Sequence, residues 1–113
     1  MDRLVIYQYN LMKKNFDKFC QENPDSDKQF NTHKRNVLAM MWNFRNIVKD
    51  KIELYTRRYD FKSVFELQDL WDIIYVKRPI LFQKAVDLFT GKEFIDYYRD
   101  TLNEIEKVIK EGE

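Results

Sequence analysis

Residues 26–58 read SDKQFNTHKRNVLAMMWNFRNIVKDKIELYTRR and contain neither glycine nor proline. One apolar row in this segment recurs at helical spacings: Phe30, Val37, Met41, Phe44, Val48 and Tyr55. This periodicity predicts a single α-helix with a length on the order of 45 Å at 1.5 Å per residue. A second apolar row lies beside the first: Leu38, Trp42, Ile47, Ile52 and Leu54. Because the apolar sector is so wide, we expect this helix to contact two neighbours, or one neighbour and an external partner.

The segment before it predicts another helix, at about residues 2–21. Its apolar row is Val5, Tyr9, Met12, Phe16 and Phe19. Pro24 follows this segment and disfavours helical backbone at the residue before it, so we expect a short turn between the first two helices.

Two more helices are predicted after residue 58. Asp60 is the expected N-cap of the third helix, with Ser63 as the alternative, and the helix ends or kinks at Pro79. Its core row is Val64, Leu67, Trp71 and Ile74. The fourth helix is expected to begin at Ile80, with the row Leu81, Ala85, Leu88, Ile95, Tyr98, Leu102, Ile105 and Ile109. Gly91 interrupts this row, so we expect a bend or split there. Four helices with short connections predict an all-α antiparallel bundle, formed by one domain of residues 1–113.

The composition agrees with a helical protein of the cytoplasm. Only two glycines and two prolines occur, whereas 35% of the residues are charged and 16% are aromatic. Cys20 is the only cysteine, which fits a reducing compartment. The N-terminal residues lack the apolar stretch of a signal peptide, so we expect a cytoplasmic protein without a membrane span.

Residues that could carry catalysis are scarce. His33 is the only histidine and Cys20 the only cysteine, so a zinc site or a catalytic triad has too few members. The glycines, Gly91 and Gly112, do not form a phosphate-binding loop. We therefore expect no enzymatic activity, no catalytic residue, no metal site and no cofactor.

Charge is distributed unevenly along the chain. Residues 28–58 contain eight lysines and arginines against two acidic residues, whereas residues 66–113 contain seven against eleven. The basic helix either balances the acidic helices or presents an anion-binding face to a nucleic acid or a host protein. The residues of that candidate face are Lys34, Arg35, Arg45 and Lys49.

Apolar side chains also exceed what single helical stripes need. The surplus either fills a wide core or forms a hydrophobic face that binds a partner or a second copy of the chain. The residues that we assign to this hydrophobic binding or oligomer face are Leu38, Trp42, Phe65, Ile73 and Phe82. We accordingly expect a homo-oligomer.

The phrase DFKSVFELQ, residues 60–68, resembles the phasin family, whose small helical proteins coat polyhydroxyalkanoate granules. Asp60, Val64, Leu67 and Gln68 match the phrase that opens the second half of the phasin helical domain, whereas Phe61 and Ser63 do not. The resemblance extends over about residues 60–90. It implies a protein without catalysis that associates through helices and adsorbs to a hydrophobic polymer. The sequence thus predicts a non-enzymatic binding or scaffolding protein, with nucleic-acid or host-protein binding through the basic helix as the alternative.

Overall fold

The structure is a computed structural model that describes residues 1–22, 27–89 and 91–112, without the side chains of residues 22, 27–32, 82, 84 and 85. Every regular element in this part of the chain is helical, which confirms the all-α prediction. The first two helices, α1 (Arg3–Glu22) and α2 (Asp27–Arg57), agree closely with the predicted ranges. Asp2 opens α1, because its carboxylate accepts hydrogen bonds from the backbone N–H groups of Leu4 and Val5, at 2.8 and 3.2 Å.

Helix α2 ends in a Schellman motif centred on Tyr59. The backbone N–H of Asp60 donates to the carbonyl of Tyr55 at 2.9 Å, and that of Tyr59 donates to the carbonyl of Thr56 at 3.1 Å. Helix α3 (Phe61–Asp72) begins directly afterwards. The carboxylate of Asp60 accepts from both the N–H and the hydroxyl of Ser63, which confirms Asp60 as the N-cap.

Between α3 and the last helix the chain changes its helical type three times. A π-helical turn, Ile73–Lys77, continues α3, and two 3₁₀ turns, Pro79–Phe82 and Lys84–Leu88, follow it. Helix α4 is Gly91–Glu111, so the predicted fourth helix is split at Gly91 and its first part is not α-helical. Proline opens the first 3₁₀ turn and Gln83 has extended backbone between the two turns, so a continuous α-helix does not run through this segment.

Two basic side chains fasten residues 79–89, which we call the strap, to the helices. The Lys34 ammonium on α2 donates to the backbone carbonyls of Val86 and Phe89, at 2.7 and 3.3 Å. Just before the strap, the Arg78 guanidinium donates to the carbonyl of Tyr97 and the hydroxyl of Thr101 on α4. The Arg78 guanidinium also lies 4.1 Å from the centre of the Tyr97 ring.

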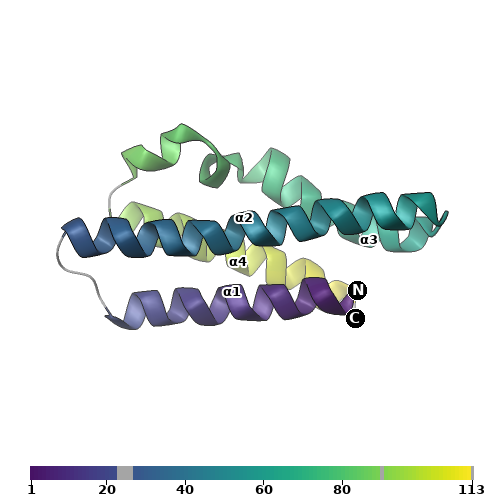
Figure 1. The fold of residues 1–113 in the computed structure, drawn as a ribbon, viewed down its shortest axis with the longest axis horizontal. Coiled ribbons are helices and arrows are strands. Elements are labelled where there is room, and N and C mark those ends of the chain that lie inside the picture. Colours follow the sequence, from purple (N-terminus) through teal and green to yellow (C-terminus); the bar gives the residue numbers. More distant parts are fainter. Residues whose placement is uncertain (23–26, 90, 113) are drawn as a thin grey trace.

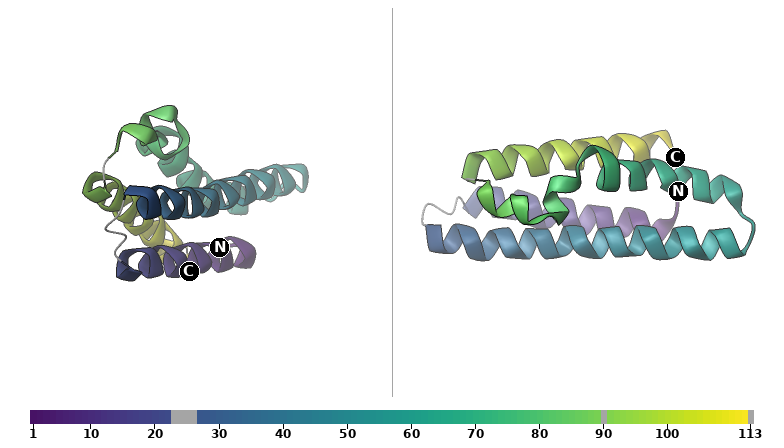
Figure 2. Two further views of the ribbon diagram at one scale, coloured as in Figure 1. Left: turned by 60° about the vertical axis from the view of Figure 1, so that its left-hand side comes forward. Right: turned by 90° about the horizontal axis from the view of Figure 1, so that it is seen from above.

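Helix α2 extends along the length of the molecule, which measures 49 × 25 × 18 Å. Figure 1 shows α1 and α2 side by side and running in opposite directions, with the strap on the side of α2 away from α1 and with α3 partly behind α2. Both views in Figure 2 agree with this arrangement, and they show both chain ends at the same end of the molecule. The turn between α2 and α3 projects beyond the two chain ends at the right of Figure 1.

The core confirms the predicted row of α1. In α2, Val37, Met41, Phe44 and Val48 are buried, Tyr55 and the second row are half-buried apart from the exposed Trp42, and the side chain of Phe30 lies outside the described part. Helix α3 differs more. Leu67, Leu70, Ile73 and Ile74 are buried, whereas Val64 and Trp71 are only half-buried. The apolar stripe of α3 is therefore rotated towards Leu70 and Ile73, which lie three residues apart on one helix face.

The strap also changes the predicted row of the last helix. The helical row predicts Leu88 in the core, but this side chain is 81% exposed, because the 3₁₀ turns and the extended Gln83 break the α-helical register that continues from Ile80. Phe94, which the predicted row leaves out, is fully buried. Tyr98, Leu102, Ile105 and Ile109 are buried as predicted, Ile95 is half-buried, and the side chain of Ala85 lies outside the described part.

Candidate functional site

Three aromatic side chains are exposed around the turn between α2 and α3. They are Tyr59, Phe61 and Phe65, which are 80%, 51% and 69% exposed. The rings of Tyr59 and Phe61 meet edge to face at 6.3 Å, and Phe65 lies one helical turn beyond Phe61 on α3. We call these three residues the tip patch. It places a compact set of rings at the projecting end of the molecule, where burial against an external surface would remove them from water.

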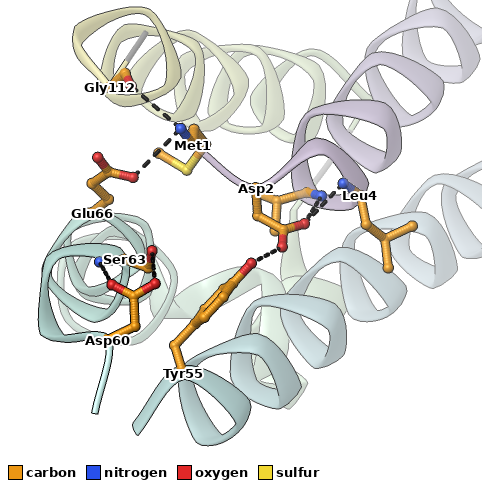
Figure 3. Close-up of polar contacts among 9 residues, drawn as sticks. Met1, Asp2, Leu4, Tyr55, Asp60, Ser63, Glu66 and Gly112 are labelled. Carbon is orange, nitrogen blue, oxygen red and sulfur yellow. Dashed lines mark hydrogen bonds and ion pairs between the residues drawn. The ribbon is translucent and has the colours of Figure 1, made fainter. Parts of the chain in front are cut away.

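Polar contacts that join α2 and α3 to the two ends of the chain hold the turn in place (Figure 3). The phenol of Tyr55 on α2 donates a hydrogen bond to the Asp2 carboxylate, and Lys51 forms an ion pair with the same carboxylate at 3.4 Å. Glu66 on α3 lies 3.4 Å from the amino group of Met1, which also donates to the carbonyl of Gly112. The tip patch therefore projects from a cross-linked support and does not depend on its own packing for its position.

The ionisation of this support follows from its contacts. The hydrogen bond to Asp2 raises the pKa of Tyr55 to about 12. For Asp2, burial acts to raise the pKa, but the hydrogen bonds from Tyr55, Val5 and Leu4 and the charge of Lys51 outweigh it, so that the pKa is lowered. At neutral pH the phenol is thus protonated and the carboxylate is charged, which is the combination that the hydrogen bond needs.

Tyr59 occupies a backbone position that normally belongs to glycine. Its φ is 57°, in the left-handed region, where a side chain with a Cβ atom costs on the order of 1 kcal/mol. Its ring is the most exposed of the tip patch, so burial returns little of this cost within the chain. Strained backbone of this kind clusters at active sites, ligand clamps and switch regions.

A second aromatic surface lies along α2 and α3. Trp42, Arg45, Ile74, Tyr75, Pro79 and Gln83 line one hollow, and Lys49, Ile52, Glu53, Gln68 and Trp71 line another. The Arg45 guanidinium of the first hollow lies 5.5 Å from the centre of the Trp71 ring of the second, so the two hollows are neighbours. We call the two hollows together the α2–α3 groove. Neither hollow is lined by a residue of the tip patch.

The predicted hydrophobic face is divided by the structure. Trp42 and Phe65 are exposed, but on different surfaces, the groove and the tip patch. Ile73 is a correction: it is 2% exposed and packs in the core, because the stripe of α3 is rotated towards it. Leu38 is half-buried against the core, and the side chain of Phe82 lies outside the described part.

The predicted basic face also needs a correction. Lys34 is 6% exposed and holds the strap, so it does not belong to a surface that binds anions. Burial lowers the pKa of this ammonium, and the charge of Asp87 opposes that shift. Arg35 and Lys49 are exposed, whereas Arg45 lies half-buried among the rings of the groove.

Sequence reasoning missed Tyr59 and the grouping of Trp71 and Tyr75 with Trp42. A signal for Tyr59 exists, because the residue between the last turn of α2 and the N-cap Asp60 is where glycine is usual. No sequence signal predicts that Trp71 and Tyr75 lie beside Trp42, because the helical spacing assigns Trp71 to the core row.

The residues considered for chemistry have ordinary surroundings. His33 is half-buried, with its ring 6.0 Å from that of Phe19. Burial raises the pKa of the Cys20 thiol, although Arg99 opposes the shift, so this thiol is not activated as a nucleophile. Within the described ranges, no group of three or more histidine, cysteine, aspartate or glutamate side chains could hold a metal ion.

The fold and these surfaces define an all-α protein. None of the helices among the described residues combines the length and apolar character needed to cross a membrane. Comparisons with protein-family models, curated proteins and solved structures each found no match. The chemistry of the two aromatic surfaces is therefore the basis for a functional proposal.

Proposed function

We propose that this is a non-enzymatic helical protein that attaches to a hydrophobic surface through the tip patch. The specific form of this proposal is a coat protein of polymer granules, similar to the phasins. An antiparallel four-helix bundle is the scaffold that would present the patch, and self-association through helix faces would allow many copies to cover one surface.

The observation that carries the proposal is the left-handed backbone of Tyr59. An exposed tyrosine in left-handed backbone, where glycine is usual, raises the free energy of the folded chain and gains little from packing within it. Together with Phe61 and Phe65 it forms an apolar surface whose burial against a polymer would contribute about 1.5–3 kcal/mol for each fully buried ring. Phe61 and Phe65 lie within residues 60–90, the range of the phasin resemblance, but Phe61 itself departs from the phasin phrase.

The test is retention on polyhydroxyalkanoate particles and on phenyl-coated beads. Phe65→Asp places a charge within the patch, and we expect it to reduce retention by about tenfold or more, since tenfold corresponds to roughly 1.4 kcal/mol. Leu88→Asp is the matched control, because Leu88 is an exposed apolar residue on the strap and not at the tip. Equal retention of the two variants, both with unchanged helicity and melting, would count against the proposal.

Nucleic-acid binding through α2 is the second candidate. Arg35 and Lys49 support it by their exposure, whereas the burial of Lys34 removes one cation from the expected row. Binding of single-stranded RNA that weakens steeply with salt and is lost in Arg35→Glu would favour this candidate over the granule coat.

A further inference from the structure

The α2–α3 groove has a centre that differs chemically from the tip patch. Among the described side chains, the Arg45 guanidinium lies near the rings of Trp42, Trp71 and Tyr75, with its central carbon 4.9, 5.5 and 5.3 Å from the respective ring centres. Trp71 and Tyr75 stack on each other at 4.7 Å, because they lie four residues apart on the α3 segment. The guanidinium thus lies against these rings. Arg45 also lines the hollow beside Trp42 and Tyr75, which opens to solvent.

This arrangement suits a carboxylate ligand. A guanidinium presents its N–H donors in a planar fork that matches the two oxygens of a carboxylate. Ring faces attract the guanidinium cation, which offsets part of the water contact that the cation loses. An anion that approaches Arg45 would also contact Trp42 and Tyr75, which are 41% and 54% exposed, so its carrier needs an apolar part next to the acid group.

Basic side chains continue along the same face of α2. Arg35, Trp42, Arg45 and Lys49 recur at helical spacing, and Glu53 is the acidic side chain that lines the groove at its far end. Arg45 and Lys49 are one turn apart, about 6 Å along the helix axis. Carboxylates at positions i and i+4 of a second helix have the same separation. An acidic helix can therefore place two negative charges opposite the two positive charges of the groove.

The rings are less suited to nucleic-acid bases. A base stacks on an open aromatic face, but in the groove Trp71 and Tyr75 cover each other and the guanidinium lies among all three rings. An apolar side chain instead fits the hollow beside Trp42, Ile74 and Tyr75 without needing a free ring face.

We propose that the α2–α3 groove binds an acidic amphipathic helix of a partner protein. One apolar side chain of that helix enters the hollow between Trp42 and Tyr75, and two carboxylates one turn apart pair with Arg45 and Lys49. This is recognition of a helix in a groove, with the apolar anchor giving affinity and the acid pair giving register. The site is separate from the tip patch, so it does not depend on the function proposed above.

The test uses a labelled synthetic helix of about 18 residues, with leucine on one face and glutamate flanking it, and measures fluorescence anisotropy with the full chain. A matched peptide replaces every glutamate by glutamine. We expect the acidic peptide to bind at least about tenfold more tightly than the neutral one, and the difference to shrink as salt rises. Equal affinity of the two peptides, or no binding of the acidic peptide at about 100 micromolar, overturns the proposal.

Substitutions in the groove test whether the peptide binds at Trp42 and Lys49. Lys49→Gln changes an exposed residue and leaves the fold intact, and we expect it to weaken the acidic peptide several-fold but not the neutral one. Trp42→Ala is expected to weaken both peptides, and Phe65→Asp neither of them. If Phe65→Asp abolishes peptide binding, or if an oligonucleotide displaces the acidic peptide in wild type but not in Lys49→Gln, the groove is not a helix site. Loss of bead retention in Phe65→Asp with intact peptide binding would separate this site from the tip patch.

Discussion

The phenol of Tyr55 on α2 donates a hydrogen bond to the carboxylate of Asp2, which also caps the first turn of α1 (Figure 3). One carboxylate thus satisfies two backbone N–H groups, one hydroxyl and the charge of Lys51. Because these contacts favour the charged form, the pair links the stability of the protein to pH in both directions.

In acid, we expect Asp2 to lose its contribution. Its native pKa is lowered, so the unfolded chain binds the proton first, and the stabilisation is complete above about pH 4 and is lost as the pH falls through the native value. Asp2→Asn keeps an oxygen that can cap α1 but cannot titrate. Urea unfolding from pH 7 to pH 2 should show this variant to be less stable at pH 7 by about 1 kcal/mol, with a smaller loss of stability in acid. An identical acid slope in the two proteins would contradict the assignment to Asp2.

In base, the same pair acts through Tyr55. The native pKa of about 12 lies above the ordinary value of 10, so the stabilisation is fully present below pH 10 and is lost as the pH rises through about 12. Burial also raises the pKa values of Tyr9 and Tyr98, so the informative quantity is the difference between wild type and Tyr55→Phe. We expect the unfolding free energies of these two proteins to converge between pH 10 and pH 12. A constant difference across this range would show that the hydroxyl does not contribute in this way.

Lys34 should control the strap more than the whole fold. Lys34→Met removes a buried charge, which is often neutral for stability, but it leaves the carbonyls of Val86 and Phe89 without this donor. We expect a global change within about 1 kcal/mol and a clear acceleration of amide hydrogen exchange within residues 79–89. Lys49→Met is the control on the exposed side of α2 and should leave strap exchange unchanged. Unaltered exchange in Lys34→Met would mean that the strap is held without Lys34, by the contacts of Arg78 and the packing of Leu81 and Val86.

The sequence was informative where periodicity alone decides the structure. The rows of α1 and α2 and the N-cap Asp60 could be predicted, because an uninterrupted 3.6-residue pattern and a local hydrogen bond leave few alternatives. The strap could not, because 3₁₀ and π turns depend on tertiary contacts such as that of Lys34 with Val86. The basic pattern of α2 likewise did not show that Lys34 points inwards while Arg35 remains exposed.

The candidate surfaces depend on the rotation of α3 about its axis. Relative to the predicted row, the buried stripe of α3 is shifted by one residue, so Ile73 lies in the core and Trp71 is half-buried beside Arg45. Helical periodicity fixes this rotation only to within about one residue when apolar residues surround the helix, as they do at Leu70, Trp71, Ile73 and Ile74. The sequence therefore predicts the helices but not which side chains of α3 are exposed.

The burial of Ile73 gives a direct check of that rotation. Ile73→Ala should reduce the free energy of unfolding by about 2–5 kcal/mol, because it leaves a cavity in the core. Phe65→Ala, at an exposed position of the same helix, should change it by less than about 0.5 kcal/mol. Chemical denaturation of both variants measures the contrast. Comparable losses for the two would place Phe65 in a packed environment and remove it from the tip patch.

Tyr59 offers the sharpest separation of stability from binding. Tyr59→Gly relieves the left-handed backbone at the end of α2, although glycine gives the unfolded chain more freedom, and the two effects partly offset each other. Because relief of the strain outweighs the added freedom of the unfolded chain, we expect the variant to be equally stable or more stable by up to about 1 kcal/mol. Retention on hydrophobic particles should nevertheless fall, because the most exposed ring of the tip patch is gone. Thermal melting and particle binding of the same preparation measure both quantities, and Tyr59→Phe, which keeps a ring, is the control that should bind as wild type does. A Tyr59→Gly variant that melts lower and binds normally would show that the tyrosine serves the fold, and the principal support for surface attachment would be lost.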